Sequence, residues 1–184
     1  MKNEITGMRL RLIVMNFLQF AVWGAYLTSM GTYLFNIGLG AKIGLFYAMQ
    51  GIVSLFMPAI MGIIADRWVP AQKLYGFCHF MAAVFMVAAG WYGYVDGEAV
   101  NFGTLFTFYS LSVAFYMPTL ALTNSVAYTA LDKVKLDPVI AFPPIRIFGT
   151  IGFICSMLLT DILGFQNNYM QFFSCACFGV ILAG

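Results

Sequence analysis

The sequence predicts an all-α integral membrane protein, and three observations lead to that prediction. Of its 184 residues, 62% are hydrophobic and only 9% are charged, whereas a soluble domain carries roughly 25% charged residues. Apolar stretches long enough to cross a bilayer recur from one end of the chain to the other. The net charge is only +2, without the dense basic patch that nucleic-acid binding requires. These features exclude an ordinary cytosolic domain, a disordered tail and a nucleic-acid partner.

The apolar stretches divide the chain into six predicted spans joined by short connections. A membrane helix needs about 20 mostly apolar residues to cross ~30 Å of hydrocarbon. Complete spans are predicted over residues 12–35, 43–65, 74–95, 102–130 and 139–163, and a sixth opens over residues 169–184. That last stretch has about 16 residues, which reach only ~24 Å. We therefore expect the sequence to stop inside its sixth helix, as part of a longer protein whose C-terminal half is missing here.

Basic residues gather on one side of the predicted membrane. They occupy the N-terminus (Lys2, Arg9, Arg11), the second connection (Arg67, Lys73) and the fourth connection (Lys133, Lys135). On the other side, the first connection has only Lys42, and the third carries Asp96 and Glu98. Because loops that stay in the cytoplasm are enriched in Lys and Arg, we expect a multi-pass protein of the cell inner membrane with a cytoplasmic N-terminus.

Arg146 lies within the fifth predicted span. An arginine at mid-membrane costs about 2.5–3.5 kcal/mol on insertion scales and usually faces a water-filled cavity or a partner. Gly149, Thr150 and Phe153 follow at helical spacing, so one stripe combines a five-donor cation, a gap, a hydroxyl and an aromatic ring. That stripe suits a polar ligand with a flat ring. The alternative is a helix that starts late, near Phe142, where Arg146 lies only ~6 Å deep and reaches the cytoplasmic surface.

Two prolines, Pro143 and Pro144, stand directly before Arg146. Within a membrane helix, prolines are tolerated where the backbone lines a cavity, and such breaks often mark transporter binding sites. Proline is equally favoured at a simple helix start. The sequence leaves both interpretations open.

Polar residues in the first and fourth spans are weaker candidates for the same cavity. Gln19 and Trp23 lie one turn apart in the first span, and Asn124 lies in the fourth. Amide side chains can pair with a nucleobase or a sugar, but they also hold membrane helices together by hydrogen bonds. Both roles remain open at this point. His79, inside the third span, is predicted to be a packed, hydrogen-bonded core residue rather than a proton relay.

Motifs of enzymes are missing from the sequence. It contains no HExxH, no GxSxG and no phosphate-binding GxxxxGK[ST]. The four cysteines lie in apolar stretches without a CxxC spacing. We therefore expect no enzyme activity, no metal and no cofactor. No carboxylate is clearly placed at the middle of a span. If the protein transports a solute together with protons, the titrating group is therefore expected in the absent part of the protein.

Four segments of the chain resemble a known transporter family. The second connection, GIIADRW (Gly62–Trp68), resembles the Gly-x-x-x-Asp-Arg signature of the major facilitator superfamily. FPPIRIFGTIGF (Phe142–Phe153), FLQFAVWG in the first span and YMPTLALTN in the fourth resemble bacterial nucleoside permeases of the nucleoside:H+ symporter family. This resemblance runs over essentially the whole chain at similar spacing.

The resemblance implies a fold and a set of roles. It implies a twelve-helix transporter of two six-helix bundles, of which this chain is the N-terminal bundle, itself made of two three-helix inverted repeats. Arg146, Thr150 and Phe153 occupy substrate-contacting positions in that family, and Asp66 and Arg67 form part of a cytoplasmic gate. The membrane protein is then expected to import nucleosides with protons by alternating access. Two alternatives stay open: a proton symporter for a sugar or another polar solute, and a non-transporting membrane scaffold.

Overall fold

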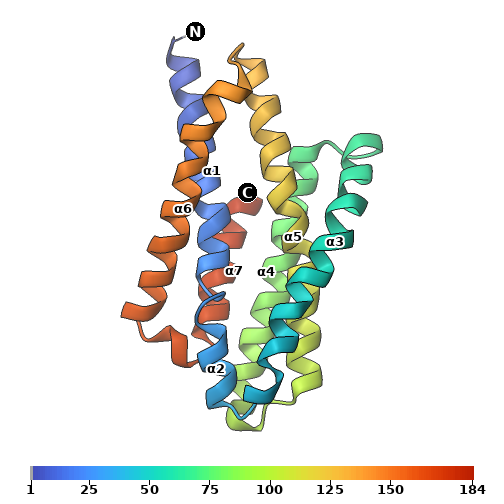
Figure 1. The fold of residues 1–184 in the computed structure, drawn as a ribbon, viewed down its shortest axis with the longest axis vertical. Helices are drawn as coiled ribbons and strands as arrows, with labels where there is room; N and C mark the ends of the chain where they lie inside the picture. Colours follow the sequence, from blue (N-terminus) through green and yellow to red (C-terminus); the bar gives the residue numbers. More distant parts are fainter. Residues whose placement is uncertain (1) are drawn as a thin grey trace.

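The computed structural model describes residues 2–184, which form helices joined by turns and short irregular connections (Figure 1). Met1, and the side chains of Lys2 and Glu98 that entered the charge pattern, lie outside what is described. The long helices are α1 (Lys2–Gly24), α3 (Ile43–Arg67), α4 (Ala71–Asp96), α5 (Phe102–Lys133) and α6 (Pro138–Ile162). Shorter helices are α2 (Met30–Asn36) and α7 (Met170–Ala183), with single 3-10 turns η1 (Gly40–Lys42), η2 (Gly97–Ala99) and η3 (Phe165–Asn167).

The described helices confirm the predicted all-α membrane architecture. The five long helices are long and apolar enough to cross a bilayer. The helices pack as one bundle in which α1 lies beside α6 and α7, α4 lies between α5 and α7, and α3 lies at the edge beside α5 (Figure 1). Large apolar side chains remain exposed on the outside, for example Leu55 on α3 and Ile147 on α6, as a surface solvated by lipid requires.

The first predicted span differs from the structure because it is not one helix. Its helix begins much earlier than residue 12, at Lys2, and ends at Gly24; residues 25–29 form turns before α2 continues to Asn36. In a membrane, carbonyls at such a break need new donors. Thr160 of α6 donates to the carbonyl of Ala25 in the break (3.2 Å), and Ser156 donates to the carbonyl of Ala21 (2.7 Å), which also accepts from the Ala25 amide (3.0 Å). The break is invisible in the sequence because the apolar pattern runs through it.

The position at which α6 begins shows which of its prolines start the helix and which lie inside it. Asp137 caps the helix by accepting a 2.9 Å hydrogen bond from the Val139 amide. Pro138 then occupies the first helical position, where its missing N–H costs nothing. Pro143 and Pro144 therefore lie inside the helix, one to two turns after its start.

Glycines allow α1 and α6 to approach closely. A Cβ atom added at Gly152 would overlap the carbonyl oxygen of Phe17 on α1, and one at Gly24 would lie 2.5 Å from the carbonyl oxygen of Phe153 on α6. Small residues are the usual means by which membrane helices bring their backbones together. This contact fixes the face of α6 that carries Arg146 against α1.

Candidate substrate-binding face

Arg146 lies well inside α6, half-buried against α1. It follows Pro138 by eight residues, or about 12 Å of helix, and stands about 6 Å from the middle of α6. The late helix start near Phe142, which would have put Arg146 near the surface, is therefore wrong. The guanidinium carbon lies 3.9 Å from the centroid of the Phe20 ring, within the range of a cation–π interaction.

The position of the guanidinium depends on the glycine one turn further along α6. A Cβ at Gly149 would lie 2.7 Å from Nη1 of Arg146 and 2.6 Å from the ring of Phe20. Any larger residue at this position would displace one of the two groups. Gly149 is thus the gap in the predicted stripe, and the guanidinium rests across it.

The donors of Arg146 are available to a ligand. A guanidinium carries five N–H donors and no acceptor. Within residues 2–184, the aromatic face of Phe20 is its direct partner, and no carboxylate or carbonyl oxygen accepts a hydrogen bond from it. A half-buried cation with free donors deep in a membrane helix is the arrangement expected of a group that binds polar atoms.

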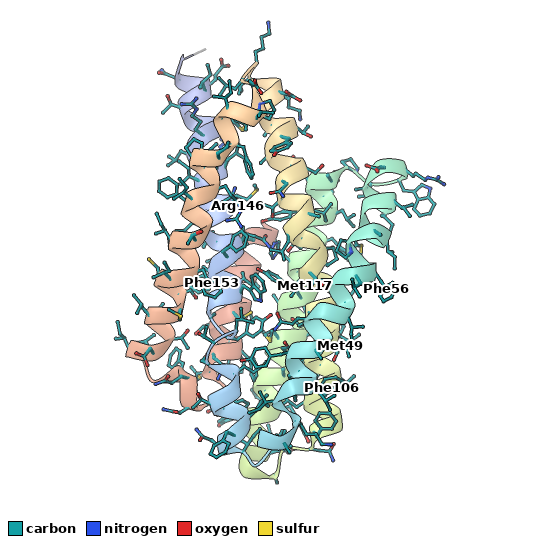
Figure 2. The ribbon with its side chains drawn as sticks, viewed as in Figure 1. Met49, Phe56, Phe106, Met117, Arg146 and Phe153 are labelled. Atoms are coloured by element: carbon teal, nitrogen blue, oxygen red, sulfur yellow. The ribbon has the colours of Figure 1, made fainter. Side chains whose placement is uncertain are left out.

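An aromatic cluster surrounds this cation, formed by Phe20, Trp23, Tyr116 and Phe153. The Trp23 ring lies 6.3 Å from Phe153 at an edge-on angle of 83°, and 6.4 Å from both Phe20 and Tyr116. The cluster joins α1, α5 and α6. Figure 2 shows Phe153 on the same side of the bundle as Arg146, with Met117 of α5 across from them. Flat apolar rings beside free hydrogen-bond donors can hold a ligand that has both a ring and hydroxyl groups.

Trp23 is held in place by a residue that the sequence analysis did not single out. Its indole Nε1 donates to Oε1 of Gln50 (3.0 Å), and Nε2 of Gln50 donates to the Tyr109 hydroxyl (2.7 Å). Gln50 therefore links α1, α3 and α5 next to the aromatic cluster. A signal for it existed, since it is the one amide side chain in the second predicted span. Phe20, also missed, offered no comparable signal among so many phenylalanines.

Thr150 and Asn124 are exposed in the structure. Thr150 lies one turn beyond Arg146 on α6, as the spacing predicted, and Asn124 lies on α5 after the buried Thr123. Neither side chain makes a hydrogen bond to another residue in the described part of the chain. Their role in binding stays a prediction.

Gln19 has a different environment from the other candidates, because both its amide nitrogen and its amide oxygen are hydrogen-bonded inside the bundle. Its Nε2 donates to Oγ1 of Thr119 (2.8 Å), and its Oε1 accepts from the Tyr75 hydroxyl (2.8 Å). His79 Nε2 lies 2.7 Å from the same oxygen. Gln19 is completely buried, so the structure shows the interhelical hydrogen-bond role for its amide, joining α1, α4 and α5. His79 is likewise a packed, hydrogen-bonded core residue, as predicted.

The proposed gate residues stand at the end of α3. Asp66 and Arg67 occupy the last turn of the helix and are both exposed. The following residue, Trp68, ends the helix and exposes 74% of its surface. Within the described residues, neither gate residue forms an ion pair, so their gating role stays a prediction.

Comparison with known proteins settles the family of the chain. A family model described as nucleoside H+ symporter matches residues 6–184. The chain belongs to the nucleoside H+ symporter family. Among curated proteins, it is 39% identical to the xanthosine permease of Escherichia coli K12 over 166 residues, which are 89% of this chain and 38% of that protein. It is 38% identical to the nucleoside permease NupG of the same organism over 179 residues, which are 96% of this chain and 41% of that protein.

The three-dimensional structure of a nucleoside transporter matches as well. The crystal structure of the nucleoside transporter NupG superposes with a TM-score of 0.87 at 38% identity, over 96% of this chain and 42% of that one. The chain therefore has the fold of one half of a major-facilitator-type transporter, as the resemblance implied. It spans about two fifths of the length of these curated relatives.

Proposed function

We propose that the protein is a symporter that imports nucleosides together with protons across the cell inner membrane by alternating access. Membership of the nucleoside H+ symporter family supports this proposal. The single observation that supports it most strongly is Arg146, a half-buried guanidinium with free donors about 12 Å inside α6, beside the aromatic cluster. A scaffold would have no use for this costly group.

Each part of a nucleoside has a complementary group on this face. Arg146 donates hydrogen bonds to hydroxyl or carbonyl oxygens of the nucleoside, and charge-assisted bonds of this kind are the stronger ones. Thr150 adds a hydroxyl contact from the next turn of α6. Phe153 packs on a ring of the ligand, with Trp23 behind it at 6.3 Å. Asn124 contributes an amide from α5. Gln19 does not contact the ligand directly but holds α1 in place through its hydrogen bonds to α4 and α5.

The rest of the binding cavity comes from a second six-helix half. The chain covers only about two fifths of its curated relatives, and the candidate face is open on one side. In our proposal the nucleoside lies between the two halves near mid-membrane, and the halves rock about it. Asp66 and Arg67 help to close the cytoplasmic side, with the N-terminus in the cytoplasm.

The coupled proton is carried by a residue of that second half. The carboxylates whose side chains the structure describes stand at helix ends: Glu4, Asp66, Asp96, Asp132, Asp137 and Asp161. None of them lies beside Arg146, where a titrating group would change substrate binding directly.

Uptake by the complete protein in proteoliposomes tests the substrate class. With an inward proton gradient, we expect saturable uptake of labelled uridine or adenosine, abolished by a protonophore and competed by unlabelled nucleosides. Saturable sugar uptake without nucleoside competition would replace the proposal with a sugar symporter. Absence of any uptake by folded protein would favour the scaffold.

A further inference from the structure

A small cavity lies in the core of the bundle, on the side of α1 that faces α4 and α7. Its wall includes Tyr26, His79, Ser112, Tyr116 and Cys175, all of them buried. The space open to the centre of a water molecule is about 10 Å³, which corresponds to a single water. Arg146, Thr150 and Phe153 of the candidate substrate-binding face do not line this cavity, although Tyr116 of the aromatic cluster does.

Two polar atoms in this wall lack a hydrogen-bond partner among the described residues. They are the hydroxyl of Tyr26 and Nδ1 of His79. Tyr26 exposes 1% of its surface and His79 none. Buried polar atoms are almost always hydrogen-bonded, and two unpaired polar atoms on the wall of a water-sized cavity point to a bound water. No hydrogen bond joins the two atoms directly, and one water in the cavity that both residues line can serve both of them.

The hydrogen-bond network fixes which of the two atoms donates. Thr119 gives its own hydroxyl hydrogen to the Tyr116 carbonyl, so its oxygen accepts from Nε2 of Gln19 at 2.8 Å. The Gln19 oxygen therefore points at Nε2 of His79, 2.7 Å away. An amide oxygen can only accept, so Nε2 carries a hydrogen, and in the neutral ring Nδ1 is a bare acceptor. The Tyr26 hydroxyl brings the complementary donor.

We propose that this cavity binds one water molecule, which accepts a hydrogen bond from the Tyr26 hydroxyl and donates one to Nδ1 of His79. Its second hydrogen goes to the oxygen of Ser112, which is free to accept because its own hydrogen goes to the Ala82 carbonyl at 2.7 Å. The water then makes three hydrogen bonds, the usual number for a buried water.

The bound water has a structural consequence for the break in the first span. Tyr26 belongs to the turn between α1 and α2. The water connects this turn to α4, and His79 and Gln19 continue the path to Thr119 on α5. Both ring nitrogens of His79 are thereby engaged, and the ring is held as the Nε2–H tautomer.

Two measurements on the complete, unmodified protein test the site. A high-resolution density map is expected to contain one water between Tyr26 and His79. Nitrogen NMR of histidine-labelled protein, with His79 assigned by the signal that disappears in His79→Gln, is expected to show the Nε2–H tautomer with a hydrogen-bonded Nδ1. A cavity without density, or a His79 ring whose bare nitrogen is Nε2, would overturn the proposal.

A pair of tyrosine variants separates the water from general packing. Tyr26→Phe removes the donor to the water, and the Nδ1 resonance is expected to shift toward the position of a nitrogen without a hydrogen bond. Tyr33→Phe is the matched control, because the Tyr33 hydroxyl is also buried without a partner among the described residues but does not line the cavity. An Nδ1 resonance unchanged in Tyr26→Phe, or shifted equally in both variants, would contradict the bridge.

Discussion

Arg146 is energetically expensive where it stands, and this cost is informative. Its cation–π contact with Phe20, at 3.9 Å, returns about 0.5–2 kcal/mol. Insertion of an arginine at the centre of a helix costs about 2.5–3.5 kcal/mol. The visible partner thus offsets only part of the cost. A residue kept at such a disadvantage is best explained by a ligand that uses its donors.

The buried amide of Gln19 and the exposed amide of Asn124 are predicted to respond to substitution in opposite ways. Gln19→Leu leaves Tyr75, His79 and Thr119 without their partner, and we expect the free energy of unfolding to fall by about 2–3 kcal/mol. Asn124→Leu, at an exposed position without internal hydrogen bonds, should leave stability unchanged but lower nucleoside affinity. Denaturation and binding measurements on both purified variants check this. Equal stabilities would contradict the network described for Gln19.

At the scale of residues, the sequence predicted the α6 stripe but not its partners. Arg146, Thr150 and Phe153 could be found because helical spacing and the rarity of charge are local properties. Phe20 and Gln50 act through contacts between α1, α3 and α6, which no local pattern encodes. For Gln19 the sequence left two roles open, and only the positions of Tyr75 and His79 on another helix distinguish them.

At the scale of elements, the close contact between α1 and α6 depends on glycines, which have no side chain to separate the two backbones. Gly152→Ala would force the new methyl group into the Phe17 carbonyl, and we expect a loss of about 1–3 kcal/mol in stability. Gly51→Ala is the matched control, since Gly51 lies inside α3 with open space around its missing Cβ. There alanine should be neutral or stabilise by about 0.5–1 kcal/mol. Thermal unfolding of the two variants provides the test, and a Gly152→Ala protein as stable as Gly51→Ala would refute the close contact.

The predicted spans agree with the helices where the apolar stretch and the helix have the same limits. The second, fourth and fifth spans end within a few residues of α3, α5 and α6. The first predicted span differs from the helices at both its start and its continuity. Its early turns, from Lys2, are helical although they carry charge, and its break at residues 25–29 is stabilised by Ser156 and Thr160 from a helix more than 100 residues away.

At the scale of the whole molecule, the charge pattern predicts which end of the bundle faces the cytoplasm. In a background without the four native cysteines, Gln72→Cys should resist a membrane-impermeant maleimide added to intact cells, because it lies in the predicted cytoplasmic second connection. Ala99→Cys, in the third connection, should react. Both positions are exposed in the structure, so access to solvent is matched. The reverse labelling pattern would invert the proposed orientation.

The fold of the whole chain could be predicted from its sequence, whereas the complete binding cavity could not. Six apolar stretches and four family-like segments were sufficient for the all-α half-transporter fold. The candidate face, however, is open on the side where a second half is proposed, so the ligand contacts from that half have no residues in this sequence. The residues described here therefore form one side of the proposed binding cavity.

Equilibrium binding of labelled uridine or adenosine to the Arg146→Leu protein tests the central claim most directly. Loss of its charge-assisted hydrogen bonds, worth about 1.5–3 kcal/mol each, should weaken binding by about 10- to 100-fold while the protein stays folded and at least as stable. Arg9→Leu, which removes an exposed positive charge near the N-terminus, should bind normally. Unchanged nucleoside affinity in a folded Arg146→Leu protein would contradict the assignment of this face as the substrate site.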